Sequence, residues 1–181
     1  MRQIENERLV AARAKRRQII LSVVMIVILV GSTAGYAISL ISGDSTPVDQ
    51  TQPYFDGNSW IVPYARYQFA VQTSPQEARN VSITGSFSLE NFRGQAVYLD
   101  SESESIKQLL GGVLSLTAQR VQEACYGSCD RIDVPERDCS SPLIVWRGSS
   151  VNRIYTNSSC VIIEGDYTSA DAFVYRVLGY I

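Results

Sequence analysis

The stretch IILSVVMIVILVGSTAGYAISLI, residues 19–41, decides how this chain is organised, because it holds no charged side chain. A helix over these residues is about 34 Å long, enough to span the hydrocarbon core of a membrane with some tilt. Six basic residues precede it, and no Lys or Arg follows it before Arg66. Since the basic flank of a membrane helix stays in the cytoplasm, the sequence predicts a single-pass membrane protein with a cytoplasmic N-terminus. The six are Arg2, Arg8, Arg13, Lys15, Arg16 and Arg17.

Four segments follow from this pattern. Residues 1–18 form a basic cytoplasmic tail, 19–41 a transmembrane helix, 42–58 a polar linker with Pro and Gly, and 59–181 an extracytoplasmic domain. One alternative is that 19–41 belongs to a cleaved signal peptide, since small residues recur near its end. The apolar run continues past those residues, which favours an anchor that stays attached.

The distribution of charged residues excludes some classes of function. The tail carries a net charge of about +4, whereas the remainder, with its excess of Asp and Glu, carries about −6. An acidic outer domain is a poor nucleic-acid binder, because phosphate contacts need clustered Lys and Arg. The chain contains no histidine, which removes Ser–His and Cys–His nucleophile pairs.

The outer domain is predicted to be α+β. The main helix is expected over 101–126, with Ser101 and Glu104 as a capping box and Gly111-Gly112 in its middle. A final helix is expected to begin at a second capping box, Thr168 and Asp171. Strands grouped with two helices indicate one antiparallel or mixed sheet with helices on one face. A short helical turn is expected at 74–78, and strands at 60–64, 67–71, 81–89, 95–99, 143–146, 153–155 and 160–163.

All four cysteines lie in the outer domain, at Cys125, Cys129, Cys139 and Cys160. An even number in an extracytoplasmic segment predicts two disulfides rather than a zinc site, which favours paired short spacings. Three pairings are possible. We expect Cys129–Cys139 to close a charged loop and Cys125–Cys160 to link the main helix to a strand.

Several motifs together resemble a known group of proteins. They are the stretches 124–129, 138–139, 143–146, 160–166 and 171–175. They resemble uncharacterised single-pass membrane proteins of small-genome archaea, and the resemblance covers most of the chain. It implies no activity. An archaeal setting implies a domain outside the cytoplasmic membrane, near the surface layer.

Candidate sites are few. The sequence contains no catalytic, cofactor-binding or metal-binding motif that we can recognise, and no cofactor is expected. The acidic residues at 100, 102 and 104 lack the Gly and Glu that a calcium loop needs at its sixth and twelfth positions. The acidic residues at 130, 133, 136 and 138 favour a solvated loop, with a weak calcium or partner site as the alternative. Asn80 and Asn157 begin glycosylation sequons.

The sequence therefore favours a membrane-anchored extracytoplasmic protein that works by binding or assembly. Its expected partners are the lipid bilayer and a protein of the membrane or envelope, not nucleic acid. One alternative is a membrane-tethered hydrolase that uses Asp100, Glu164 and Asp166. Another is a thiol–disulfide factor that uses Cys125 and Cys129. A polar pocket with convergent carboxylates favours the hydrolase, and a free exposed thiol favours the redox factor.

Overall fold

The computed structural model describes Met25 and residues 51–129 and 131–181. The predicted tail, transmembrane helix and most of the linker lie outside the described residues. Among the residues that are described, no helix is both long and apolar enough to cross a membrane. Residues Asp49–Ile181 form a compact unit, which contains the domain expected to lie outside the membrane.

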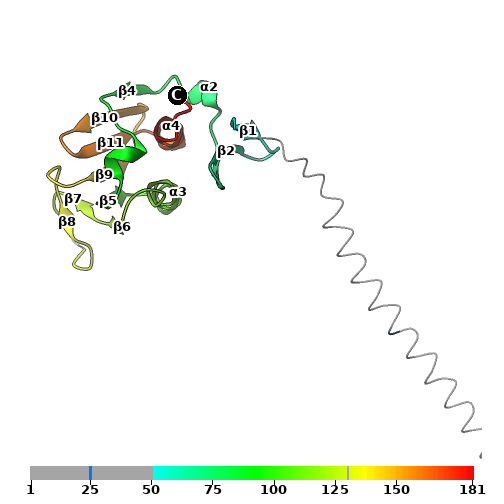
Figure 1. The fold of residues 1–181 in the computed structure, drawn as a ribbon. Helices are drawn as coiled ribbons and strands as arrows, with labels where there is room; N and C mark the ends of the chain where they lie inside the picture. Colours follow the sequence, from blue (N-terminus) through cyan, green and yellow to red (C-terminus); the bar gives the residue numbers. More distant parts are fainter. Residues whose placement is uncertain (1–24, 26–50, 130) are drawn as a thin grey trace, which may run out of the picture. The chain divides into compact units, whose positions relative to one another are not determined.

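A six-stranded mixed sheet forms the centre of this domain (Figure 1). Four neighbouring strands, β11, β9, β5 and β6, run parallel to one another, and β10 and β4 run the opposite way. A helix connects the parallel pair β5–β6, as a crossover of this kind requires. In spatial order the strands are β4 (Ser82–Thr84), β10 (Arg153–Asn157), β11 (Cys160–Glu164), β9 (Leu143–Arg147), β5 (Ala96–Ser101) and β6 (Arg120–Glu123).

One face of the sheet is covered by two helices, α3 (Glu104–Leu114) and α4 (Tyr167–Val177). Side chains alternate across a strand, so Val97 and Leu99 of β5 point to this face together with Ile144 of β9. They form one cluster with the buried stripe of α3 and with Phe173 of α4, whose ring stacks on Phe87. This is the main core.

The opposite face has no helix over it among the described residues. Tyr98, Leu143 and Ile162 point to this side and form a second, smaller buried cluster. A loop region crosses it, containing β7 (Cys125–Tyr126) and β8 (Glu136–Arg137), which pair in parallel. The Arg137 guanidinium lies 4.4 Å from the centre of the Tyr98 ring and covers it.

A small antiparallel sheet, β1 (Tyr54–Phe55), β2 (Trp60–Tyr64) and β3 (Tyr67–Val71), precedes the main one. The predicted hairpin at 60–64 and 67–71 is confirmed. So is the short helix α2 (Pro75–Ala78), with Ser74 and Glu77 as its capping box. Strand β1 lies inside the segment expected to be a linker, so ordered structure begins before residue 59.

The α+β class and the two disulfides are confirmed, whereas three helix boundaries were wrong, and the described residues form three sheets rather than one. The main helix ends at Leu114, and residues expected to continue it form β6 and β7. It begins after Ser103 rather than Ser101, and neither supplies a side-chain cap. The last helix is capped by Asp166, whose carboxylate accepts from the Thr168 N–H, and not by Thr168. The strand expected over 81–89 is confined to β4 (Ser82–Thr84), and a short 3₁₀ helix, η1 (Leu89–Phe92), begins at its expected last residue.

Candidate functional site

The sheet topology directs attention to the carboxyl ends of β5, β6 and β9. The chain leaves β5, forms α3 and returns as β6 on one side, whereas β9 pairs with the other side of β5. In sheets of parallel strands, ligands bind outside the carboxyl ends where the strand order switches in this way. Polar side chains stand at these three ends, namely Asp100 on β5, Glu123 on β6 and Arg147 on β9.

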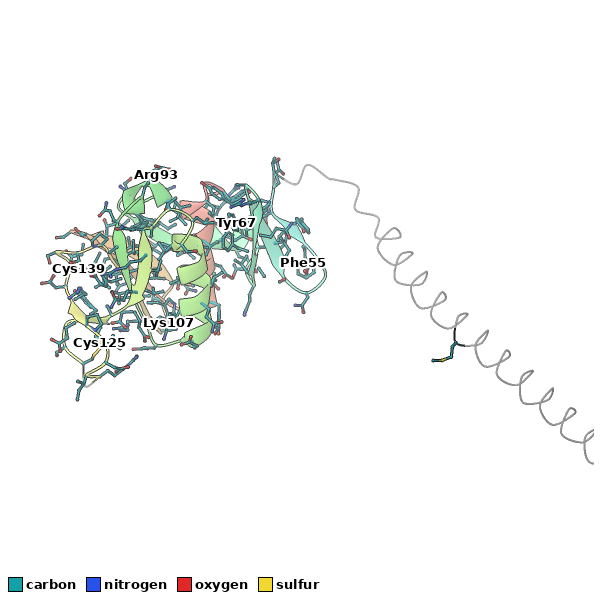
Figure 2. All side chains as sticks on the ribbon, turned by 60° about the horizontal axis from the view of Figure 1, so that its bottom comes forward. Phe55, Tyr67, Arg93, Lys107, Cys125 and Cys139 are labelled. Atoms are coloured by element: carbon teal, nitrogen blue, oxygen red, sulfur yellow. A yellow bond between two sulfur atoms is a disulfide. The ribbon has the colours of Figure 1, made fainter. Side chains whose placement is uncertain are left out.

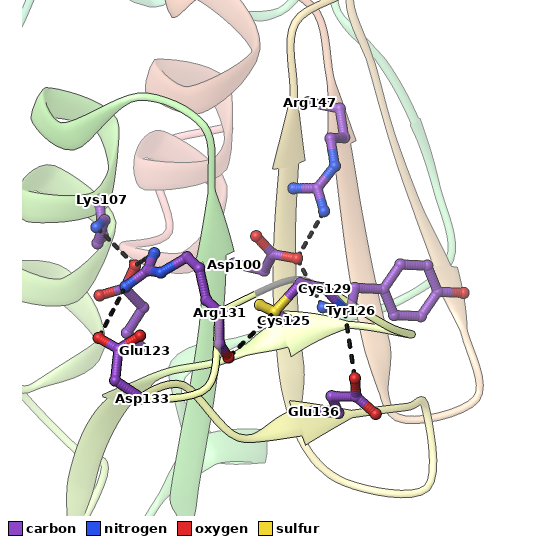
Figure 3. The surroundings of a disulfide bond; sticks show 10 residues. All are labelled: Asp100, Lys107, Glu123, Cys125, Tyr126, Cys129, Arg131, Asp133, Glu136 and Arg147. Atoms are coloured by element: carbon purple, nitrogen blue, oxygen red, sulfur yellow. Dashed lines mark hydrogen bonds and ion pairs between the residues drawn. A yellow bond between two sulfur atoms is a disulfide. The ribbon is translucent and has the colours of Figure 1, made fainter.

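A disulfide between Cys125 and Cys129 lies at this edge (Figure 3). The second disulfide joins Cys139 to Cys160. All four cysteines are therefore paired, as predicted, but the predicted partners were wrong. Cys125 follows β6 rather than ending a helix, and Cys160 begins β11, three strands away at about 4.8 Å per strand. That separation is too large for a disulfide.

One ion-pair cluster fixes the loop on the sheet. The Asp100 carboxylate accepts from the Arg147 guanidinium at 2.6 Å and from the Tyr126 backbone N–H at 2.7 Å. Glu102 lies 3.5 Å from the same guanidinium. Asp100 raises the pKa of Arg147 further above its ordinary value. Asp100 is thus occupied with holding β5, β9 and β7 together.

A second cluster lies on the other side of the disulfide, towards α3. The Glu123 carboxylate accepts from Arg131 at 2.6 Å and from Lys107 of α3 at 2.9 Å (Figure 3). Arg131 and Lys107 hold the pKa of Glu123 below its ordinary value. Lys107 also pairs with Glu104 at 2.8 Å, and Arg131 with Asp133 at 3.7 Å. These pairs tie the disulfide loop to the helix.

A groove of about 360 Å³ runs between α3 and β6 beside this cluster. Leu99 and Val121 form its apolar wall, and Gly111 and Gly112 of α3 form the side facing them. The polar lining comes from Glu104, Lys107, Gln108 and Glu123. Strand β6 is the last strand of the sheet. The backbone groups on the outer side of an edge strand are available to another chain.

The two glycines are not there because of a steric conflict. A methyl group at Gly111 would lie 3.8 Å from Leu99, and one at Gly112 would lie 3.9 Å from Phe69, which are ordinary contacts. Each glycine costs a helix interior about 1 kcal/mol relative to alanine. Gly111 and Gly112 therefore destabilise the helix, and their lack of side chains leaves the groove open.

The carboxylates of the hydrolase alternative do not converge on a shared reacting position. Asp100 is bound to Arg147, and Asp166 caps α4. Glu164 accepts from Arg153 at 2.6 Å and from the Tyr155 hydroxyl at 2.9 Å. Arg153 lowers the pKa of Glu164, the opposite of what a general acid needs. No group of three or more metal-ligating side chains comes together within 51–129 and 131–181.

One polar residue that the sequence analysis misread is Asp171. It is 1% exposed and accepts from the backbone N–H groups of Gln72 and Thr73, at 2.9 and 2.8 Å. Its other carboxylate oxygen has no hydrogen-bond partner among the described residues. Burial raises its pKa. Asp171 therefore joins the end of β3 to α4, and the signal for this role was an acidic residue inside an apolar helix stripe.

Both sequon asparagines are exposed. Asn80 follows α2, and Asn157 ends β10 at the turn into β11. Comparison with protein-family models, with curated proteins and with solved structures finds no match for this chain. The function must therefore be argued from the site alone.

Proposed function

We propose that this chain is a membrane-anchored extracytoplasmic protein that works by binding or assembly. Its outer domain takes up an extended segment of a protein partner along β6, with partner side chains in the groove between α3 and β6. The observation that carries this proposal is the open edge of the six-stranded sheet beside a groove kept free by Gly111 and Gly112.

Addition of a strand to a sheet edge is a recurrent mode of peptide recognition. Backbone hydrogen bonds supply affinity, and pockets for alternate side chains supply specificity. Here Val121, which is half-buried above the buried Leu99, offers an apolar surface for one side chain. Glu104, with 67% of its side chain exposed, offers a carboxylate at the end of the groove. This end and the acidic balance of the outer domain favour a partner segment that carries Lys or Arg.

The membrane anchor is proposed on the charge step across residues 19–41. Protease added to intact cells should remove the outer domain and leave the basic tail protected. Protection of the large part instead would reverse the orientation. The resemblance to single-pass membrane proteins of small-genome archaea is consistent with the proposed placement and stays a prediction.

Site-specific photo-crosslinking of the full chain in native membranes tests the groove. A photoreactive residue is placed at Gln108, which lines the groove, and in a matched variant at Thr84, which is exposed on β4 at the opposite edge of the same sheet and lies outside the Asn80 sequon. We expect a discrete protein adduct from the Gln108 position and none from Thr84. Equal adduct yields from the groove position and the control position on β4, or no adduct from Gln108, would contradict the proposal.

A groove-filling substitution separates recognition from fold. In Gly111→Met, an unbranched side chain with good helix propensity occupies the groove. We expect the Gln108 adduct to fall at least tenfold while the melting temperature does not decrease. An adduct of unchanged yield in Gly111→Met would show that the crosslink does not report on groove occupancy.

The thiol–disulfide alternative lacks the free exposed thiol that would favour it, because all four cysteines are paired, but one observation ranks it above the hydrolase. The pair Cys125–Cys129 links residues four apart and lies at the edge of the fold, whereas Cys139–Cys160 links two layers. In such a reaction, a thiolate of a partner dithiol attacks Cys129, the more exposed cysteine, and releases the Cys125 thiol. The second partner thiol then frees Cys129, leaving the partner oxidised.

Differential alkylation in buffers of graded redox potential tests this alternative. The redox factor requires Cys125 and Cys129 to be reduced at potentials where Cys139–Cys160 stays oxidised. Reduction of both disulfides together, coincident with unfolding, would exclude it and would leave the binding proposal unaffected.

A further inference from the structure

A second concavity lies at the end of the sheet opposite the disulfide Cys125–Cys129. Its volume is about 240 Å³, and it is bordered by residues just before β5 and β9, by η1 and by the turn between β10 and β11. Figure 2 labels Arg93, which follows η1, and Cys125 on opposite sides of the domain. The two concavities are therefore separate.

The lining of this cavity is polar yet uncharged. Within the part of the chain that the structure describes, no Asp, Glu, Lys or Arg lines it, and its cysteine is held in a disulfide. The side chains that carry hydroxyl or amide groups are Ser86, Asn91, Gln95, Thr156, Ser158 and Ser159. A ligand with a net charge would find no counter-ion here, whereas a neutral ligand with several hydroxyl groups would find many partners.

Hydrogen bonds hold one end of each amide group at the rim of the cavity, where both side chains are exposed. The Asn91 side-chain oxygen accepts from the Ser88 N–H at 2.8 Å and from the Ser88 hydroxyl at 3.0 Å. The Gln95 side-chain nitrogen donates to the Asn91 backbone oxygen at 3.1 Å. Among the described residues, this leaves the Asn91 NH₂ as a donor and the Gln95 side-chain oxygen as an acceptor. Hydroxyl groups of a ligand accept from the first and donate to the second.

Apolar surface and backbone geometry complete the cavity. Phe87, Phe92 and Val161 lie beneath it and, being buried, present only a small apolar surface to a ligand. Gly85 has φ of +98°, and a side chain there would overlap the Thr156 hydroxyl, since a methyl would lie 2.1 Å from it. Glycine thus lets β10 bring Thr156 to the cavity. The volume lies below the range of about 300–1,000 Å³ for drug-sized ligands, which fits one sugar ring.

We infer that this cavity binds a neutral saccharide through Asn91 and Gln95. The inference does not depend on the groove between α3 and β6 or on the identity of a protein partner. Two sources supply this chemistry, namely a glycan of another molecule and a glycan attached to Asn157 in the neighbouring turn. The experiment distinguishes them.

Saturation-transfer NMR on the full chain in detergent provides the test. The probes are the methyl glycosides of glucose, galactose, mannose and N-acetylglucosamine, with glucuronate as a charged probe. We expect transfer to at least one neutral glycoside and none to glucuronate. Absence of transfer to all four neutral probes, or equal transfer to glucuronate, would overturn the inference.

Two variants locate the binding. Asn91→Asp keeps the acceptor oxygen for Ser88 but replaces the free donor with a charged oxygen, so we expect at least a tenfold loss of affinity at an unchanged melting temperature. Asn157→Gln removes the sequon at an exposed residue that does not line the cavity. Unchanged binding in Asn157→Gln supports an external saccharide, and increased binding supports the attached glycan as occupant. Unchanged binding in Asn91→Asp would overturn the assignment of the cavity.

Discussion

The two faces of the six-stranded sheet are closed by different means. Among the described residues, the helical side holds one cluster of 25 buried residues, contributed by the sheet, by α3 and α4 and by the preceding segment from β2 to α2. The opposite face carries six, beneath a loop region that contains β7, β8 and both disulfides. The helical face therefore depends on apolar burial. The disulfide face buries too little apolar surface to hold its cover by that means, and it relies on covalent and ionic links.

The proposed binding groove lies at the boundary between these two faces. The proposed groove lies at the edge where α3 stops covering the sheet, next to β6. Two contacts connect this edge to the loop on the other face, namely the hydrogen bond from the Tyr126 N–H to Asp100 and the ion pair between Arg131 and Glu123. Substitutions in the loop that covers the disulfide face should therefore reduce partner binding more than substitutions at exposed positions of the helical face.

The largest expected effect compares neighbouring residues of β9 that point to opposite faces. Ile144 faces the helices and Leu143 faces the disulfide loop, and both are fully buried. Ile144→Ala should cost the upper half of the range of about 2–5 kcal/mol, because α3 and α4 cannot collapse into the cavity. Leu143→Ala should cost less, because a loop can move in. Urea unfolding of both variants measures this, and equal losses would contradict the comparison.

Removing each disulfide ranks second. Replacing Cys139 and Cys160 with Ala should cost about 3 kcal/mol, and replacing Cys125 and Cys129 about 2 kcal/mol, because the first pair closes the longer loop of the unfolded chain. The first pair also crosses the layers on the weaker face. Loss of Cys139–Cys160 should therefore reduce the further effect of Leu143→Ala and leave that of Ile144→Ala unchanged. A double-mutant cycle tests this coupling.

Acid–base behaviour should differ in sign between the faces. Burial raises the pKa of Asp171 in the folded state above its unfolded value near 3.8, so its favourable contribution is complete below that value and is lost as pH rises through the folded pKa. Arg153 lowers the pKa of Glu164, so that contribution is present above about 4.5 and is lost as pH falls.

Two variants check these signs. As pH rises from 3.8, the unfolding free energy of Asp171→Asn should increase relative to the wild type. As pH falls below 4.5, that of Glu164→Gln should approach the wild-type value from below. Urea unfolding between pH 3 and 7 measures both, and parallel curves for either variant would contradict the assignment of that residue.

The smallest effect concerns the glycine pair. Gly112→Ala should stabilise the fold by about 0.5–1 kcal/mol, because alanine is the better helix former and its methyl makes only an ordinary contact with Phe69. Gly57→Ala, at a φ of +99° in a turn, provides a contrast and should destabilise. A lower melting temperature in Gly112→Ala would show that the glycine is required by the fold rather than by the groove.

The sequence by itself determined most of the local elements. Alternation and turn residues identified the hairpin at 60–64 and 67–71, Ser74-Pro75 identified the start of α2, and the apolar run at 160–163 identified a central strand. Cysteine number and position predicted two disulfides. These features depend on neighbours within a few residues, where spacing along the chain and distance in space agree.

Only the tertiary structure decided the pairing of strands and cysteines. Apolar residues at helical spacing in 101–126 continue into the residues that form β6. An apolar residue such as Val121 fits the buried side of a helix and also a strand that packs against α3, so the spacing could not distinguish the two. Because the chain forms β6 after Leu114, Cys125 lies three strands from Cys160. The observed pairs are therefore Cys125–Cys129 and Cys139–Cys160 instead of the predicted ones. The groove and the saccharide cavity arise in the same way, since each joins residues from segments that meet only when the sheet forms.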